Sequence, residues 1–132
     1  LNIKVLELEF RRVLFRSNLF DNEISDINVL ENVNFKKLQK LYLSYNKKID
    51  IKVLENVNFK KLQELYCSCI QISNIKALKN VNFKELQILD LKKNKISDIN
   101  TLEIVNFKQL QKLDLSSNKI SDSKVSGIIR IG

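Results

Sequence analysis

Hydrophobic residues recur along this chain with a period of 24 residues. Five units open in register, at Leu14, Leu38, Leu62, Leu86 and Leu110. Counted from zero at the opening Leu, the best-preserved units place apolar side chains at offsets 0, 3, 5, 10, 13, 16, 19 and 21. A period of this length indicates one supersecondary unit that is copied and stacked. Stability must then come from the interfaces between units, because one unit alone cannot bury its apolar side.

The start of each unit predicts a short strand. In the segment LDLKK of the unit at Leu86, apolar and polar residues alternate. Alternate side chains of a strand point to opposite faces, so Leu89 and Leu91 face inward and Asp90 faces outward. One such strand per unit, with all units stacked in the same direction, makes a parallel sheet.

The second half of each unit predicts a short helical return. Ile99, Leu102 and Val105 recur at intervals of three, which is the spacing of a helical or 3₁₀ segment with one inward face. A Ser-Asp pair precedes this segment, and its Asp suits a helix N-cap. The pairs are Ser25-Asp26, Ser97-Asp98 and Ser121-Asp122.

An asparagine follows the strand at offset 8. An amide side chain carries donors and an acceptor, so it can satisfy the backbone of its own turn and of the neighbouring turn. The predicted ladder consists of Asn22, Asn46, Asn94 and Asn118. Ile70 takes this offset in the third unit, and in Asn46-Lys47-Lys48-Ile49 the following Ile is shifted by one residue. We therefore expect the turn at Ile70 to be looser and the turn at Asn46 to be distorted.

The motif LxxLxLxxN, present as Leu86-Leu89-Leu91-Asn94, resembles the leucine-rich repeat signature, and it returns from Leu110 to Asn118. The continuation NxISDIxxL, from Asn94 to Leu102, is similar to the branch typified by internalins and by a regulatory subunit of a protein phosphatase. The resemblance implies an α/β solenoid: a horseshoe with a parallel sheet on the concave face and short helical or 3₁₀ segments on the convex face. Such proteins are mostly interaction scaffolds with unrelated partners, so the biochemical role is not inherited with the fold.

The outward strand positions vary between units while the core positions do not, and this predicts a partner-binding concave face. All three tyrosines of the chain fall on or beside it. Tyrosine combines apolar area with a hydroxyl and is enriched at interfaces, although exposed strand positions also favour it for its β propensity. The candidate residues are Lys40, Tyr42, Ser44, Tyr45, Glu64, Tyr66, Ser68, Ile88, Asp90, Lys92, Lys112 and Asp114.

These features favour a protein–protein interaction scaffold that binds a protein partner and is not an enzyme. The alternative is a non-catalytic regulatory or targeting segment of a larger enzyme. Asp90 and Asp114 should be neighbours on adjacent strands, and paired carboxylates can perform acid–base chemistry. Here they would lie on an open surface, in a chain that contains no His to serve as a base.

The formal charge of +8 raises the possibility of nucleic-acid binding. Lysines recur at offset 22, after the Phe, as Lys36, Lys60, Lys84 and Lys108. This lysine column should run along one flank of the solenoid, away from the middle of the sheet, without interleaved aromatic side chains for base stacking. A solvated flank is the better interpretation, and nucleic acid is a less favoured partner.

No cofactor or metal is expected. Cys67 takes an inward position and Cys69 lies just past the strand, and a C-x-C pair without a second Cys or His cluster offers too few ligands for a closed zinc site. No run of residues approaches the length of a membrane span. A cytoplasmic location is slightly favoured; because the chain begins at Leu1 without a Met, a signal peptide and a cell-surface location stay open.

Residues 1–132 are expected to form one array of about five units, truncated at both ends. Residues 8–17, LEFRRVLFRS, break the pattern, and Ser17 stands where Leu65 stands in a later unit. The decapeptide resembles the translation, in one frame, of a common sequencing adapter. We therefore expect it to be an assembly artefact; the alternative is a divergent N-terminal cap with exposed arginines.

Overall fold

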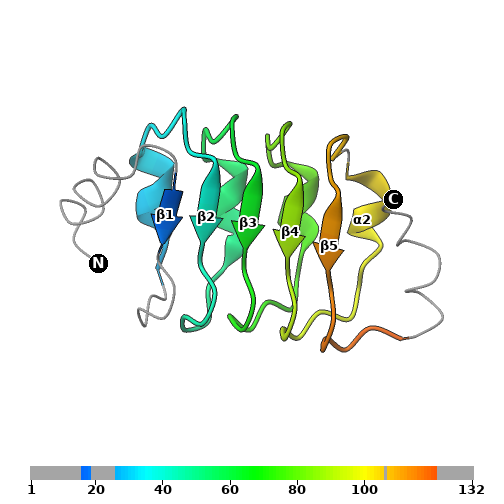
Figure 1. Ribbon diagram of the computed structural model, residues 1–132. Coiled ribbons are helices and arrows are strands. Elements are labelled where there is room, and N and C mark those ends of the chain that lie inside the picture. The colour runs from blue at the N-terminus through cyan, green and yellow to red at the C-terminus, as the bar shows by residue number, and fades with distance from the viewer. Residues whose placement is uncertain (1–15, 19–25, 106, 122–132) are drawn as a thin grey trace.

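Figure 1 shows the computed structural model, which describes residues 16–18, 26–105 and 107–121. Five short strands form one parallel sheet in which the spatial order follows the chain order. The strands are β1 (Arg16–Asn18), β2 (Lys40–Tyr42), β3 (Glu64–Tyr66), β4 (Ile88–Asp90) and β5 (Lys112–Asp114). Each strand follows its neighbour by one 24-residue unit, so the array is an α/β solenoid.

The strands pair in register, one unit against the next. Leu41 pairs with Leu65, and Leu65 pairs with Leu89. These three side chains are buried, whereas the residues on either side of each are half-buried on the opposite face. The predicted alternation is confirmed. Because the register is exact by unit, side chains at one offset form a column across the sheet.

The return path of each unit contains a short helical segment, and these segments lie behind the sheet in Figure 1. They are η1 (Asn28–Asn32), η2 (Ile51–Glu55), η3 (Lys76–Lys79) and α2 (Thr101–Ile104). The first three are 3₁₀ helices and the last is a single α-helical turn. Both forms fall within the predicted helical or 3₁₀ return, and neighbouring segments pack against one another.

An Asp or Asn at offset 12 precedes each helical segment and accepts a backbone hydrogen bond. Asp50 is the N-cap of η2, and its Oδ1 lies 2.9 Å from the amide nitrogen of Lys52. In the other units the equivalent side-chain oxygen also accepts the amide proton of the residue two positions later. These acceptors are Asp26, Asn74 and Asp98. The prediction that Asp26 and Asp98 are N-caps is wrong, because Ile27 is the N-cap of η1 and Asn100 that of α2, so the two carboxylates order the turn before the helical segment. Asp122 lies outside the described residues.

The core fills the space between the sheet and the helical segments. The Phe side chains at offset 21 form one of its columns: Phe59 and Phe83 are fully buried. Phe35 stacks on Phe59 with ring centroids 6.1 Å apart. Cys67 replaces the inward Leu of the other units and is itself buried, so the apolar column continues through it.

The turns after the strands share one backbone feature. The residue at offset 7 has a positive φ in every described unit, at Tyr45, Cys69, Lys93 and Ser117. The third unit adds a second such residue, Gln71, with φ of 60°. A non-Gly residue in this region is uncommon and costs free energy, so the turn around Ile70 differs from its neighbours.

The turn at Asn46 is distorted as predicted. Lys48 occupies the offset of the buried Ile72 and Ile96 but is exposed, and Ile49 is buried instead. The hydrogen bonds between turns change accordingly. In the fourth and fifth units, Lys95 N and Lys119 N donate to the preceding turn, to Ile72 O at 2.7 Å and to Ile96 O at 2.8 Å. In the second unit, Ile49 N instead donates to the following turn, to Ile70 O at 3.3 Å.

Most of the segment 8–17 lies outside the described residues, as does Asn22. The exceptions are Arg16 and Ser17, whose backbones belong to β1 and pair with Lys40 and Leu41 of β2. The origin of this segment stays a prediction. Within the described ranges, no helix is long and apolar enough to cross a membrane.

Candidate protein-interaction face

The outward side chains of β2 to β5 form two columns, which together we call the sheet face. At offset 2 the column runs Lys40, Glu64, Ile88 and Lys112. At offset 4 it runs Tyr42, Tyr66, Asp90 and Asp114. Neither column repeats one residue type across all four strands, in contrast to the column of Leu residues between them.

Tyr42 and Tyr66 form a stacked pair at one end of the sheet face. Their ring centroids are 4.6 Å apart and their planes differ by 4°. This separation matches the spacing of neighbouring strands, so the rings stand parallel because their backbones are paired in register. The predicted adjacency is confirmed, and the pair presents a continuous aromatic surface.

A hydrogen-bonded network links both columns beside this pair. The Tyr66 hydroxyl donates to Glu64 Oε2 at 2.9 Å, and Lys40 Nζ lies 2.7 Å from Glu64 Oε1. Burial raises the pKa of Tyr66 well above its usual value, and the hydrogen bond to Glu64 and the nearby carboxylate charges raise it further. Tyr66 therefore stays a neutral hydroxyl donor whose position is fixed by Glu64.

Asp90 and Asp114 continue the offset-4 column on β4 and β5. Each carboxylate accepts the amide proton two residues later: Asp90 from Lys92 and Asp114 from Ser116, both at 3.0 Å. Hydrogen bonding from the Ser116 hydroxyl lowers the pKa of Asp114; the Ser116 amide and the charges of Lys92 and Lys112 act the same way, against burial. A carboxylate that shares a proton with a neighbour has a raised pKa, so this geometry does not favour an acid–base pair.

The prediction that Ser44 and Ser68 contribute to the exposed face is wrong. Both are buried, with exposed fractions of 4% and 2%. Offset 6 lies past the strand end, where the chain turns inward, and a serine there is small enough to be enclosed. Ser44 Oγ accepts the amide proton of Ser68 at 3.0 Å, so it serves the backbone of the next unit.

The remaining predicted residues lie around the stacked and acidic positions. Ile88 and Lys92 are half-buried, and Lys112 is exposed. Tyr45 is 42% exposed and occupies the left-handed position of its turn, at the strand exit. The structure therefore places ten of the twelve candidates at the surface of the sheet or its edge.

The asparagine ladder is formed most completely by Asn94. Its Nδ2 donates to Leu91 O and Lys92 O in its own turn and to Cys67 O in the preceding unit. Its Oδ1 accepts the amide protons of Ile70 and Ile72. The predicted dual role, within the turn and between turns, is confirmed for this residue.

Asn118 makes the equivalent contacts one unit later. It donates to Leu115 O and to Leu91 O, both at 2.9 Å, and accepts from the Ile96 amide. Asn46 donates to Leu43 O at 2.8 Å within its own turn. Ile70, which replaces the asparagine of the third unit, is fully buried and relies on Asn94 for its amide.

The lysine column and the cysteines occupy the positions that the sequence indicated. Lys36, Lys60, Lys84 and Lys108 are all exposed, before the strands.

Cys67 is buried, and this burial raises the pKa of its thiol, while Cys69 lies half-buried in the exit turn; neither forms a disulfide. Within the described part of the chain, no three His, Cys, Asp or Glu side chains are grouped so that they could hold a metal ion.

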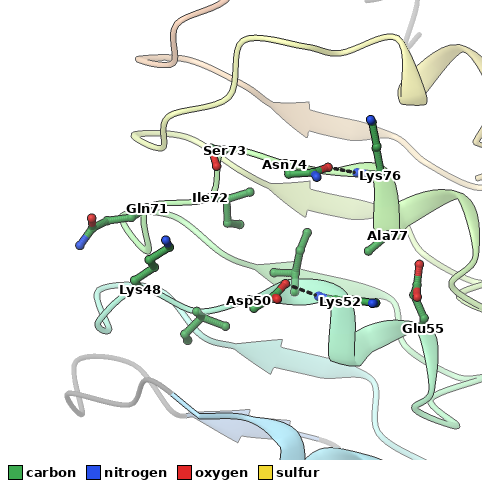
Figure 2. A pocket seen from close by; sticks show the side chains of 12 residues that line it. Lys48, Asp50, Lys52, Glu55, Gln71, Ile72, Ser73, Asn74, Lys76 and Ala77 are labelled. Atoms are coloured by element: carbon green, nitrogen blue, oxygen red, sulfur yellow. Dashed lines mark hydrogen bonds between the residues drawn. The ribbon is translucent and has the colours of Figure 1, made fainter.

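The sequence did not predict an open groove of about 440 Å³ between the second and third units (Figure 2). Its lining includes Lys48, Gln71 and the helical segments η2 and η3. The groove lies where the two irregular turns adjoin. Lys48 is exposed at an offset where other units bury an Ile, and the backbone of Gln71 has a positive φ. Its two acidic groups, Asp50 and Glu55, already accept hydrogen bonds from Lys52 N and Asn80 Nδ2. In the sequence, this groove was indicated only by the displacement of the apolar residue by one position, from Lys48 to Ile49.

Comparisons with known proteins agree with this architecture. The family model described as leucine rich repeat matches residues 60–120. A comparison with curated protein sequences finds no match.

Two solved structures of internalins from Listeria monocytogenes are similar. Internalin InlF is 33% identical over 76% of this chain, with a TM-score of 0.63. Internalin C2 is 30% identical over 89%, with a TM-score of 0.71. The chain spans 27% of the first internalin and 48% of the second. This chain is a leucine-rich repeat protein whose 24-residue units resemble those of the internalins.

Proposed function

We propose that the chain is a non-catalytic scaffold that binds a protein partner through its concave sheet face. The repeat fold is of a protein-interaction type. The main support for the sheet face is the stacked pair of Tyr42 and Tyr66, because it presents aromatic area on a rigid sheet. Rigid aromatic anchors contribute much of the affinity at protein interfaces and lose little conformational entropy on binding.

The sheet face differs in chemistry along the array. The stacked tyrosines on β2 and β3 make one end aromatic, and Asp90 and Asp114 make the adjoining end acidic. An extended or convex protein segment with one apolar and one basic element would complement both ends. The outward positions vary from strand to strand, which suits recognition of such a non-repetitive partner.

The test uses a partner captured with the immobilised chain and then purified. Replacing both tyrosines (Tyr42→Ala, Tyr66→Ala) should weaken binding by about 2 kcal/mol or more, which is roughly thirtyfold in Kd. Both residues are outward and only half-buried, so the variant should stay folded, with a urea midpoint lowered only by the loss of the ring stacking and of the Tyr66–Glu64 hydrogen bond.

A matched double variant on the flank provides the control. Lys60→Ala with Lys84→Ala also removes two long side chains, but both are exposed and precede the strands. These changes should alter the association rate and its salt dependence far more than the final affinity. If the tyrosine variant is folded and binds as tightly as the parent, the partner does not use the sheet face.

A further inference from the structure

The two faces of the Tyr66 ring have different surroundings. Tyr42 covers one face, at a centroid distance of 4.6 Å and nearly parallel. Since the strands run in the order β2, β3, β4, the other face of the ring is directed toward the offset-4 position of β4, which is Asp90. The Asp side chain is much shorter than that of Tyr. The side chains of this column therefore shorten from the Tyr66 ring to the Asp90 carboxylate, and we call the place beside the ring and above Asp90 the step.

The floor of this step has an available hydrogen-bond acceptor. Asp90 Oδ1 accepts the amide proton of Lys92 at 3.0 Å, which fixes the orientation of the carboxylate. Among the described residues, its second oxygen receives no hydrogen bond and Asp90 forms no ion pair. A carboxylate that is held in place while one oxygen stays available is suited to a cationic donor.

The charges nearby also favour a cation. The charges of Glu64 and Asp90 both act on the Tyr66 hydroxyl and raise its pKa, so the ring remains a neutral phenol in a negative field. Glu64 is already engaged by Lys40, which leaves Asp90 as the acidic group of the step. Lys92, past the end of β4, is half-buried, and its charge helps to lower the pKa of Asp114.

We propose that this step binds the guanidinium group of an arginine from the protein partner, stacked on the face of the Tyr66 ring that is directed toward β4 and hydrogen-bonded to Asp90. A planar cation can lie parallel to the ring at van der Waals distance and direct its N–H groups at the carboxylate below. Lysine has a compact ammonium that cannot stack in this way, so the step favours arginine. This inference rests on the proposed role of the sheet face, and it names one chemical group that the partner supplies.

The experiment measures the binding of the guanidinium group in a small compound, in the absence of the protein partner. N-acetylarginine amide and its neutral isostere N-acetylcitrulline amide are titrated into the intact chain at constant ionic strength, and the ring protons of Tyr66 are followed by NMR. The arginine compound should produce a saturable shift with a Kd of roughly 10 mM. The citrulline compound should produce no saturable shift.

Two carboxamide variants make the test specific. Asp90→Asn keeps an oxygen to accept the Lys92 amide proton but removes the charge, and it should weaken arginine binding about threefold or more. Asp114→Asn is the matched control: it removes the same charge one strand further on, where the preceding residue in the column is Asp90 and not an aromatic ring. It should leave the Kd within a factor of about two.

The outcomes separate this inference from the proposed function. Equal shifts with arginine and citrulline, or equal effects of Asp90→Asn and Asp114→Asn, would overturn the arginine site. If the affinity of a protein partner still depended on Tyr42 and Tyr66, the proposed function of the sheet face would hold although the arginine site had failed. Arginine binding at Tyr66 together with a partner that ignores both tyrosines would instead support the arginine site and contradict the proposed function.

Discussion

Asn94 Oδ1 accepts the amide proton of Ile70 at 3.1 Å, from one unit further along the chain. The third unit has Ile70 in place of the asparagine, and the backbone amide of Ile70 bonds to the asparagine of the fourth unit. The same oxygen also accepts from Ile72, so one amide side chain organises two turns.

Replacing this residue (Asn94→Ala) should lower the free energy of unfolding by about 1–3 kcal/mol. The variant leaves the buried amides of Ile70 and Ile72 and the carbonyl of Cys67 without their partner. Urea unfolding followed by circular dichroism measures the change. Asn82→Ala, at an exposed position of the same residue type, is the control and should stay within about 0.5 kcal/mol. Equal effects of the two substitutions would contradict the role of the ladder.

Hydrogen exchange should rank the turns by their regularity. The amide of Lys95, which belongs to the regular turn of the fourth unit, donates to Ile72 O at 2.7 Å, whereas the amide of Ile49, in the distorted turn of the second unit, donates to Ile70 O at 3.3 Å. Longer bonds in an irregular turn break at a lower free energy of local opening. Exchange measured residue by residue should therefore show Lys95 better protected than Ile49. If Ile49 exchanges as slowly as Lys95, the turn of the second unit is not looser than the turn of the fourth.

Truncating the buried serine of the second unit (Ser44→Ala) should destabilise the fold by about 1–3 kcal/mol. The substitution removes the acceptor of the Ser68 amide, and both positions are enclosed, so water cannot replace the lost bond. Thermal and urea unfolding provide the measurement. Ser73→Ala, at an exposed position, tests the loss of a hydroxyl alone and should be nearly neutral. An unchanged midpoint for Ser44→Ala would mean that this serine is not a structural residue.

Tyr66→Phe should change the alkaline stability of the chain. Burial and Glu64 raise the pKa of Tyr66 above its ordinary value of 10.0. A raised pKa means that its contribution is fully present below pH 10.0 and declines as the pH rises through the folded-state pKa. The difference in unfolding free energy between the parent and Tyr66→Phe should therefore narrow as the pH rises above 10.0. A difference that stays constant throughout the alkaline range would show that the Tyr66 hydroxyl is not coupled to folding.

Much of the fold followed from the sequence because a 24-residue period fixes local structure and neighbours together. Alternation at Leu89 and Leu91 determined a strand, and identical spacing determined that strands pair in register. The pairing of Tyr42 with Tyr66 then required only that both stand at offset 4. The asparagine ladder was predictable for the same reason, since an amide at a strand exit meets the carbonyls of two turns.

The tertiary structure decided what each side chain contacts across the boundary between units. Alternation placed Ser44 outward, but the chain has left the strand by that point, so the backbone turns the hydroxyl toward the Ser68 amide. The groove of Figure 2 depends on two irregular turns that adjoin only after stacking. The hydrogen bond from the Ile70 amide to Asn94 likewise depends on the next unit. A repeat sequence determines the position of each residue within its own unit, whereas its hydrogen-bond partners and burial depend on the conformation of the unit packed against it.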